Sequence, residues 1–364
     1  MDTLFPFTST RPVTAIRLGI LTLGEKWDRL LPGGRPSDIP ENIVPNSALA
    51  ALIRQKLTVN LPSTTDATFP VVLGAGTDLS PATLARILSQ ATKLVYPWQI
   101  FQLNDQAIRD DFELLTRGRQ SAPIPPSVQV ISPQSIFVEQ GASISHSVLN
   151  ASTGPIYIGR NASIMEGCLI RGPFALCEGA VVKMGARIYG ATTIGPYSTA
   201  GGEIKNSVLF GYSNKGHDGY LGDSVIGEWC NLGAGTSNSN LKNNAGEVKV
   251  WSPDVATSQD GQTAATGSGQ FISAGLKCGL LMGDYSRAAI NTSFNTGTVV
   301  GVCCNVYGEG LMPKYIPDFS WGIHNKGPKY IFEKALRDID NWKKLKNQSL
   351  SDAEILTLKH IFGK

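Results

Sequence analysis

The chain has 364 residues, of which 42% are hydrophobic and 17% are charged, with a net charge of +3 at pH 7. This balance excludes charge-driven disorder and allows a large buried core. The near-neutral charge, with no run of five or six basic residues, disfavours a nucleic-acid partner. The 39 glycines follow no Gly-X-Y period, which excludes collagen and indicates a turn-rich architecture.

Residues 1–20 carry Asp2, Arg11 and Arg17 among prolines, so they resemble neither a signal peptide nor a membrane span. We therefore expect a cytoplasmic protein with no membrane partner. The six cysteines form no CxxC pair and have no histidine at zinc-site spacing. They are predicted to be reduced and buried, and no metal site is expected.

The N-terminal part, residues 1–122, is predicted to be a small α/β domain. Candidate strands cover residues 15–23 and 69–73, and helical patterns cover residues 80–92 and 104–117. Ser80-Pro81 fits an N-cap followed by proline at the first helical position. The proline-rich residues 122–126 read as a stiff linker to the next domain.

A six-residue period dominates the middle of the chain. Eight apolar residues lie in one phase, namely Ile158, Ile164, Ile170, Leu176, Val182, Ile188, Ile194 and Ala200. The period recurs in the pairs Val138 and Ile144, Ile226 and Leu232, and in the run Met282, Ala288, Phe294, Val300, Val306 and Met312. Such a sustained period is the signature of a repeat architecture.

Gly or Asn recurs just after the apolar position, for example at Gly159, Gly195 and Asn295, which predicts a short strand followed by a tight corner. Three such hexads make one triangular coil, with the aliphatic side chains stacked inside. The pattern resembles the left-handed parallel β-helix of the acyltransferase superfamily, and the hand of the coil comes from that resemblance. The expected fold is mainly β: this β-helix over residues 123–320, the N-terminal α/β domain and a C-terminal helical extension over residues 321–364.

Two segments are predicted to interrupt the coil. Residues 204–220 carry polar side chains where the solenoid requires aliphatic ones, and residues 238–274 form a polar excursion that is either a functional loop or a disordered one. Beyond the solenoid, helical patterns cover residues 329–346 and 349–362.

The choice of a general base is narrow, because the chain has only four histidines, at positions 146, 217, 324 and 360. His217 lies in a glycine-rich stretch, Gly216-His217-Asp218-Gly219-Tyr220, where the backbone can approach a ligand closely. A single loop histidine is also commonly just a solvated side chain. The segments around it decide between the two.

Three segments, in order and spacing, resemble a known family. They are Gly202-Glu203-Ile204-Lys205-Asn206-Ser207, His217 to Asp223, and Asn231-Leu232-Gly233-Ala234-Gly235-Thr236. They resemble the acetyltransferase half of GlmU, the bacterial bifunctional enzyme that makes UDP-N-acetylglucosamine, and its archaeal sugar-phosphate nucleotidyltransferase relatives, including a GlmU-like sugar nucleotidyltransferase subgroup. The resemblance covers about residues 130–310.

The resemblance implies an N-acetyltransferase that uses acetyl-CoA as co-substrate and acts on an amino-sugar 1-phosphate in sugar-nucleotide biosynthesis. His217 matches the general base, which removes a proton from the sugar's 2-amino group as it attacks the thioester. Lys205 matches a lysine that faces the sugar phosphate. The other matches are sugar-contacting positions at Tyr220, Asn231 and Asn240, and backbone contacts to the acetyl-CoA arm at Ala234 and Gly235.

The sequence also departs from the family. The phosphate-binding arginine is expected after a Gly-Pro-aromatic-Ala element, but Gly172-Pro173-Phe174-Ala175 is followed by Leu176-Cys177-Glu178, with Arg171 just before it. Asn240 is followed by Leu241, as in the archaeal relatives, where the bacterial enzymes have tyrosine. These differences leave the identity of the amino sugar open.

Residues 1–122 resemble a truncated nucleotidyltransferase domain around Thr10-Arg11-Pro12 and Tyr96-Pro97-Trp98, but the family's initial Gly-x-Gly-Thr-Arg element is absent. Gly74-Ala75-Gly76 is only a weak phosphate-loop signal, and Gly33-Gly34-Arg35 reads as a turn. We expect this domain to be degenerate, with Mg²⁺ required only if it is an active nucleotidyltransferase.

The leading hypothesis is therefore acetyl transfer by a homotrimer, because family sites lie between adjacent prisms. The alternatives are a sugar-1-phosphate nucleotidyltransferase or bifunctional enzyme, and a non-catalytic scaffold that binds sugar nucleotides.

Overall fold

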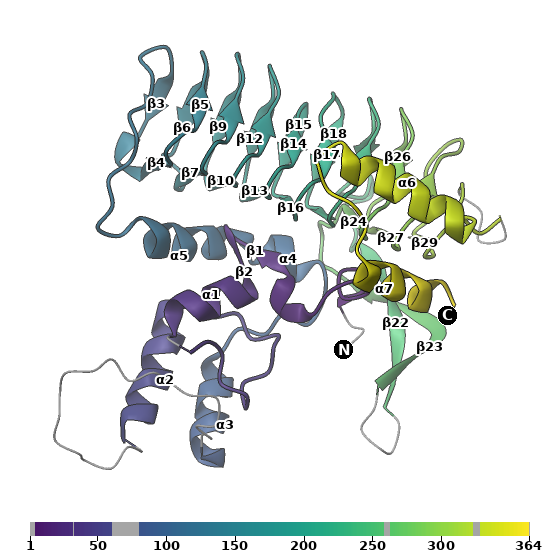
Figure 1. Ribbon diagram of the computed structural model, residues 1–364, viewed down its shortest axis with the longest axis horizontal. Helices are drawn as coiled ribbons and strands as arrows, with labels where there is room; N and C mark the ends of the chain where they lie inside the picture. The colour runs from purple at the N-terminus through teal and green to yellow at the C-terminus, as the bar shows by residue number, and fades with distance from the viewer. Residues whose placement is uncertain (1–3, 32, 60–79, 258–262, 323–327, 364) are drawn as a thin grey trace.

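The computed structural model describes residues 4–31, 33–59, 80–257, 263–322 and 328–363. A parallel β-solenoid over residues 129–316 forms the body of the molecule, and Figure 1 shows its coils stacked in a row along the long axis. The N-terminal helices lie along one side of the row, and the C-terminal helices lie against its far end (Figure 1).

The described part of the solenoid has three parallel sheets, one for each side of the prism. The nine-stranded sheet contains β4 (Ile136–Val138), β7 (Ile156–Ile158), β10 (Phe174–Leu176), β13 (Thr192–Ile194), β16 (Val208–Leu209), β19 (Val225–Ile226), β24 (Leu280–Met282), β27 (Thr298–Val300) and β29 (Tyr315–Ile316). The eight-stranded sheet contains β5 (Ser143–Ile144), β8 (Ser163–Ile164), β11 (Val181–Val182), β14 (Thr199–Ala200), β17 (Asn214–Lys215), β20 (Asn231–Leu232), β25 (Arg287–Ala288) and β28 (Asn305–Val306).

The six-stranded sheet forms the third side. It contains β3 (Gln129–Ile131), β6 (Val148–Asn150), β9 (Leu169–Arg171), β12 (Arg187–Tyr189), β15 (Glu203–Lys205) and β18 (Tyr220–Gly222). Beyond β18, the strands β21 (Ser237–Asn238) and β26 (Ser293–Phe294) pair with each other in parallel.

The predicted hexapeptide core is confirmed. Every residue of the phase that starts at Ile158 is buried inside the prism, as are those of the later run from Met282 to Met312. In regular coils each strand pairs with the strand three hexads further along the chain, for example Phe174 opposite Thr192. The continuous column of buried aliphatic side chains supplies the hydrophobic driving force for stacking.

The predicted interruption at residues 204–220 is wrong, because β15 to β18 continue all three sheets. The coils simply become shorter here: Thr193 pairs with Val208 and Ile204 pairs with Leu221, so each coil falls short of three full hexads. Residues are lost at the corners, and the inward position shifts relative to a six-residue count. Buried Ile204 therefore follows buried Ala200 sooner than the hexad step would place it.

The N-terminal region is α/β, as expected, but its regular sheet among the described residues is small. The continuous strand expected over residues 15–23 is wrong: η2 (Val13–Ala15) leads into an antiparallel pair, β1 (Arg17–Leu18) and β2 (Leu21–Thr22). Gly19, with φ of 79°, makes the turn. A Cβ there would lie 2.5 Å from Asp111 Oδ2, so glycine is required for close packing as well.

The α-helices described in this region are α1 (Leu23–Leu30), α2 (Ser47–Val59), α3 (Pro81–Gln90), α4 (Gln99–Gln102) and α5 (Asn104–Thr116). The helical predictions over 80–92 and 104–117 are confirmed by α3 and α5, whereas α1 and α2 are not predicted from the sequence. The expected strand at 69–73 lies outside the described residues. Leu4 and Phe7 share one buried cluster with Val208, Leu281 and Val299, so this region packs on the nine-stranded sheet.

The excursion after β21 contains a long antiparallel hairpin, β22 (Lys249–Thr257) and β23 (Thr263–Ser273). Buried Val248 and Val250 anchor its base in the cluster with Leu4 and Phe7. Figure 1 shows the hairpin on the same side of the solenoid as the N-terminal region. The solenoid ladder bypasses the hairpin, because β19 pairs directly with β24.

Both predicted C-terminal helices are confirmed as α6 (Phe332–Lys344) and α7 (Asp352–Phe362). Ser351 caps α7, since its hydroxyl accepts a hydrogen bond from the Glu354 backbone. Aromatic side chains dock the helix pair on the solenoid corner, where Trp229 and Phe319 are buried. All six cysteines are free and buried, as predicted. Within the described ranges, no helix is both long and apolar enough to cross a membrane.

Candidate functional site

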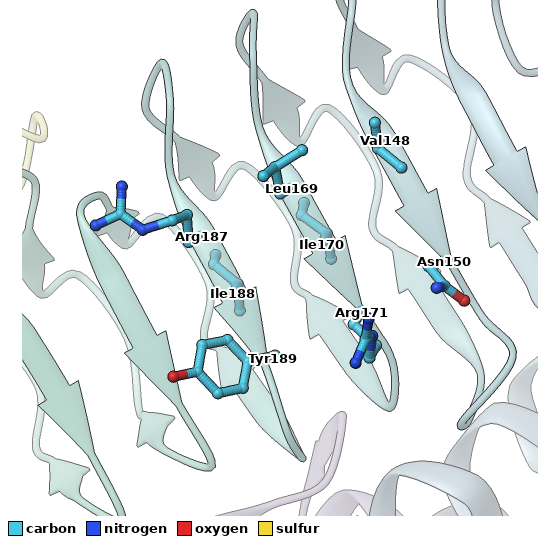
Figure 2. A pocket seen from close by; sticks show the side chains of 8 residues that line it. All are labelled: Val148, Asn150, Leu169, Ile170, Arg171, Arg187, Ile188 and Tyr189. Atoms are coloured by element: carbon cyan, nitrogen blue, oxygen red, sulfur yellow. The ribbon is translucent and has the colours of Figure 1, made fainter.

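The outer face of the six-stranded sheet carries a shallow groove. Residues alternate across a strand, so buried Ile170 and Ile188 point into the prism while their neighbours point outward. Figure 2 shows these neighbours in two columns over the sheet. The groove has a volume of about 450 Å³ and is lined by Val148, Asn150, Leu169, Ile170, Arg171, Arg187, Ile188 and Tyr189.

Three cationic side chains gather along this face, from Arg171, Arg187 and Lys205. The strand registers place Arg187 opposite Glu203 and Tyr189 opposite Lys205. Arg187 Nη2 lies 3.7 Å from Glu203 Oε2, and the Tyr189 hydroxyl donates a 2.7 Å hydrogen bond to Glu203 Oε1. These three cationic side chains outnumber the Glu203 carboxylate on the face, so the face is net positive and suited to an anionic group such as a phosphate.

Tyr220 lies at the end of this face in a hydrogen-bonded network. Its hydroxyl oxygen accepts a 3.1 Å bond from Asn240 Nδ2, which also donates to Asp223. Asp223 is buried and accepts a further 2.6 Å bond from Asn206 Nδ2. Burial, with the nearby Asp223 carboxylate, raises the pKa of Tyr220 to about 12. The phenol therefore stays protonated at neutral pH, and within the described residues it donates no hydrogen bond, so its proton can be donated to a ligand.

His217 lies at the corner between the eight-stranded and six-stranded sheets, after β17 and before β18, and its side chain is exposed. Its backbone oxygen accepts a 2.5 Å hydrogen bond from Lys215 Nζ. Among the described residues, the imidazole makes no hydrogen bond, so both ring nitrogens face solvent or a ligand. An exposed imidazole on an anchored corner has the access that a general base needs.

The corner of the following coil holds Ala234 and Gly235. The Gly235 N–H donates a 3.0 Å bond to the Asp218 carbonyl, which makes this corner the direct neighbour of the His217 corner. Gly235 has φ of 73°, and a Cβ there would lie 2.1 Å from Asn291 Oδ1, so only glycine fits. The Ala234 carbonyl is committed to the Asn291 N–H at 2.7 Å.

The structure thus brings His217, Ala234 and Gly235 to the corner before β18, whereas Asn240 and the Tyr220 hydroxyl lie beside Asp223 at the other end of that strand. Lys205 lies one coil earlier, opposite Gly222. Asn231 lies apart from Lys205, on β20 of the eight-stranded sheet beside Asn214 and Arg287. The predicted site residues therefore occupy two adjacent sides of the prism that meet at the His217 corner.

Arg187 and Tyr189 line the groove and Glu203 is the partner of both, but none of the three is predicted from the sequence. A signal for the first two is present, because Ile188 is an inward hexad position and its two neighbours must point outward. The family resemblance instead directs the search for an arginine to the positions after the Gly-Pro-Phe-Ala element, where Leu176 and Cys177 are buried.

The N-terminal nucleotidyltransferase-like residues are engaged with the solenoid. Thr10 Oγ1 and Arg11 both bind the Asp284 carboxylate, and Arg11 Nη1 also lies 3.0 Å from Glu228 Oε1. Tyr96 and Trp98 stack on each other with ring centroids 4.6 Å apart. Gly33 and Gly34 form a turn, as predicted. The Gly74-Ala75-Gly76 segment and His324 lie outside the described residues.

A metal site does not emerge from the described part of the chain, where no three His, Cys, Asp or Glu side chains cluster.

Comparisons with known proteins give a family match for the first 120 residues and distant relatives among bifunctional enzymes. The family model described as sugar nucleotidyl transferase matches residues 1–42 and 40–120. GlmU of Geotalea uraniireducens is 29% identical over 217 residues, which are 52% of this chain and 47% of that protein. The bifunctional sugar-1-phosphate nucleotidylyltransferase/acetyltransferase of Sulfurisphaera tokodaii is 35% identical over 106 residues, 29% of this chain and 23% of that protein. The chain thus spans about half, or less, of the length of these curated relatives.

Among solved structures, the polysialic-acid-specific acetyltransferase NeuO matches with a TM-score of 0.25 and 11% identity, over 60% of this chain and 97% of that one. The UDP-N-acetylglucosamine acyltransferase of Francisella novicida matches with a TM-score of 0.20 and 14% identity, over 66% and 89%. The strand registers establish the solenoid independently of these low scores. By sequence, the chain is a distant homologue of GlmU and of the archaeal bifunctional sugar-1-phosphate nucleotidylyltransferase/acetyltransferase, and its first 120 residues match the sugar nucleotidyl transferase family.

Proposed function

We propose that this chain is an acetyl-CoA-dependent N-acetyltransferase that acts on an amino-sugar 1-phosphate. The observation that carries the proposal is the placement of the exposed His217 at one end of β18 and of the Tyr220–Asn240–Asp223 network at the other end of the same strand. β18 belongs to the six-stranded sheet, whose outer face carries the cationic side chains. A base, polar sugar-binding groups and an anion-binding surface therefore lie on one side of the prism.

The chemistry needs few groups. The sugar's neutral amine attacks the thioester carbonyl carbon of acetyl-CoA, a C–N bond forms and the C–S bond breaks. His217 takes the proton that the amine nitrogen loses, and the coenzyme A thiolate leaves and is protonated to the thiol. General base catalysis of this kind contributes about 10²- to 10⁴-fold.

The cationic face supplies the phosphate contacts in this proposal. Arg171 and Arg187 offer planar guanidinium groups for bidentate contacts, and Lys205 adds a point charge near Tyr189. Its Nζ lies 6.0 Å from the Tyr189 ring centroid. Tyr220 and Asn240 would contact the sugar hydroxyls, and Asn231 would do so from the neighbouring sheet.

The coenzyme arm is assigned to the Ala234–Gly235 corner. Because Gly235 gives its N–H to Asp218 and Ala234 gives its carbonyl to Asn291, this corner would present the Ala234 N–H and its small surface to the acyl chain. The groove is shallow on a single prism, so enclosing a sugar and a pantetheine arm requires a second copy. We therefore propose a homotrimer, with the site between adjacent solenoids.

The deciding experiment measures thiol release from acetyl-CoA with a panel of hexosamine 1-phosphates, using wild type and His217→Ala. His146→Ala is the matched control, because His146 is an exposed histidine at the same type of corner, between β5 and β6. We expect turnover with at least one amino sugar, a fall in kcat of at least about 100-fold in His217→Ala, and no change in His146→Ala. Intact turnover in a folded His217→Ala protein would overturn the assignment of the base.

A second candidate, sugar-1-phosphate nucleotidyl transfer, is favoured by the family match of residues 1–120. Against it, Arg11 and Thr10 are held by Asp284 of the solenoid. Release of pyrophosphate from a nucleoside triphosphate with Mg²⁺ and a sugar 1-phosphate would support this activity. No release under these conditions would leave acetyl transfer as the single proposed reaction.

A further inference from the structure

Lys215 occupies a position that the repeat reserves for an aliphatic side chain. It lies on β17 opposite Ala200, an inward hexad residue, and only 1% of Lys215 is exposed. The neighbouring inward residues Ile204, Leu209 and Leu232 are all apolar and buried. A lysine among these inward side chains loses the hydration of its ammonium group, which is unfavourable unless hydrogen bonds within the protein replace it.

The Lys215 ammonium group bonds to backbone carbonyls at the corner rather than to a carboxylate. Its Nζ donates to the Gly201 oxygen at 3.1 Å and to the His217 oxygen at 2.5 Å. These two carbonyls belong to successive coils at the same corner of the prism. Within the described residues Lys215 makes no ion pair. Burial lowers its pKa to about 8, and the Asp218 charge opposes that shift.

Two glycines let the His217 corner lie directly on the coil before it. A Cβ on Gly201 would lie 2.6 Å from the Gly216 oxygen, and a Cβ on Gly202 would lie 2.8 Å from the His217 oxygen. Side chains larger than hydrogen would therefore push the corner outward. The corner thus packs directly against the backbone of Gly201 and Gly202, and hydrogen bonds from Lys215 hold it from inside the prism.

Resting on the proposed function, we propose that Lys215 is a positioning residue for catalysis: it fixes the backbone of His217 through the His217 carbonyl and so sets where the imidazole lies. Lys215 does not touch substrate, since its ammonium group is enclosed in the prism. A misplacement of about 1 Å at a catalytic group is enough to cost a large part of the rate.

The first test is kinetic. Lys215→Met keeps the length and apolar stem but removes the donors, and Lys314→Met is the matched control. Lys314 Nζ likewise donates to the backbone and side-chain oxygens of Thr296, in a coil away from the corner. We expect Lys215→Met to lower kcat about 10-fold or more while KM for both substrates stays within about threefold, and Lys314→Met to change neither.

The dependence on His217 is tested by a double-mutant cycle. In the His217→Ala background, Lys215→Met should lower kcat less than about twofold, because the group it positions is gone. An equal loss in both backgrounds would overturn the proposal. If Lys215→Met does not fold, Gly202→Ala displaces the same corner with Lys215 in place and should give the same kinetic pattern; an unchanged kcat in folded Gly202→Ala would also overturn it.

A readout without activity separates this proposal from the proposed function. The Glu203 and Gly235 amides donate to the Gly219 and Asp218 carbonyls of the corner. Their hydrogen exchange should be about 10-fold faster in Lys215→Met, and the Asn305 amide, bonded to Ser320 in a late coil, should be unchanged. Unchanged exchange at Glu203 and Gly235 would refute the tether, whereas accelerated exchange in a protein without transferase activity would refute only the proposed function.

Discussion

Asn240 donates a hydrogen bond to the hydroxyl oxygen of Tyr220, so the start of the excursion after β21 is tied to β18. The same amide binds buried Asp223, which fixes its orientation. The excursion therefore touches the site through its first residues, while the base of its hairpin packs near Leu4 and Phe7 on the N-terminal side.

Tyr220→Phe tests the sugar-binding role of the phenol. The change removes the free donor and the acceptor for Asn240, so we expect KM for the sugar phosphate to rise about 3- to 10-fold, as for loss of one neutral hydrogen bond. The raised pKa of Tyr220, about 12, keeps the phenol protonated, so the pH profiles of the variant and of wild type should have the same shape. Steady-state kinetics from about pH 6 to about pH 10 check both expectations.

Arg187→Ala and Arg171→Ala test the cationic face. If the phosphate lies over β9 and β12, each variant should raise KM for the sugar phosphate about 10-fold or more with kcat nearly unchanged, because a charge-assisted bond contributes about 1.5–3 kcal/mol. The effect should shrink at high salt. Arg160→Ala, an exposed arginine on a corner away from the groove, is the control. A KM that is equal in all three variants would contradict the assignment of this face.

Regular coils make a solenoid core predictable, and shortened coils do not. The run from Ile158 to Ala200 follows a strict six-residue step because its early coils keep three full hexads. After Ala200 the corners lose residues, so counting by six places polar residues inside and predicts a break that the structure lacks. Lys215 therefore falls in a predicted loop, although it is buried in the column.

The site is predictable to the extent that it is local. The stretch from His217 to Tyr220 lies on one corner, and its order along the chain is sufficient to find it. The contact of Arg187 with Glu203, in contrast, depends on the pairing of β12 with β15, where the register falls short of three hexads. This register depends on the lengths of the corners, which composition and spacing do not encode.

The stability of the protein should depend on pH through Lys215. Burial lowers its folded-state pKa from 10.5 to about 8, so between these values the unfolded chain binds more protons than the folded one. The free energy of unfolding should therefore rise with pH across this window, by an amount on the order of 3 kcal/mol for the full shift. The cost of burying the charge is fully present below about pH 8.

Denaturant unfolding of wild type and Lys215→Met at about pH 7, 8.5 and 10 checks this expectation. The difference between the two proteins isolates Lys215 from the tyrosines and other lysines that also titrate. Curves that stay parallel across the range would contradict it.

Asp111 holds the N-terminal region together. Its carboxylate binds Lys26 and accepts hydrogen bonds from the backbone N–H groups of Ile20 and Leu21 at 2.7 and 3.0 Å. Asp111→Asn leaves the Lys26 ammonium buried without its counter-charge, so we expect a loss of about 3–5 kcal/mol. Asp105→Asn, which breaks an exposed pair with Arg109, should cost less than about 1 kcal/mol. Thermal unfolding compares the two, and equal losses would argue against the buried role.

The burial of all six cysteines decides how the protein behaves toward thiol reagents. Burial raises the pKa of the thiols, for Cys177 to about 11 and for Cys304 to about 12, so the reactive thiolate is scarce as well as inaccessible. A chromogenic disulfide reagent added to the folded protein should therefore react with the coenzyme A thiol that the reaction releases, with no contribution from the protein's own cysteines. When the coils separate, the same reagent would react with the exposed cysteines, so the rate of that reaction measures how fast the solenoid opens.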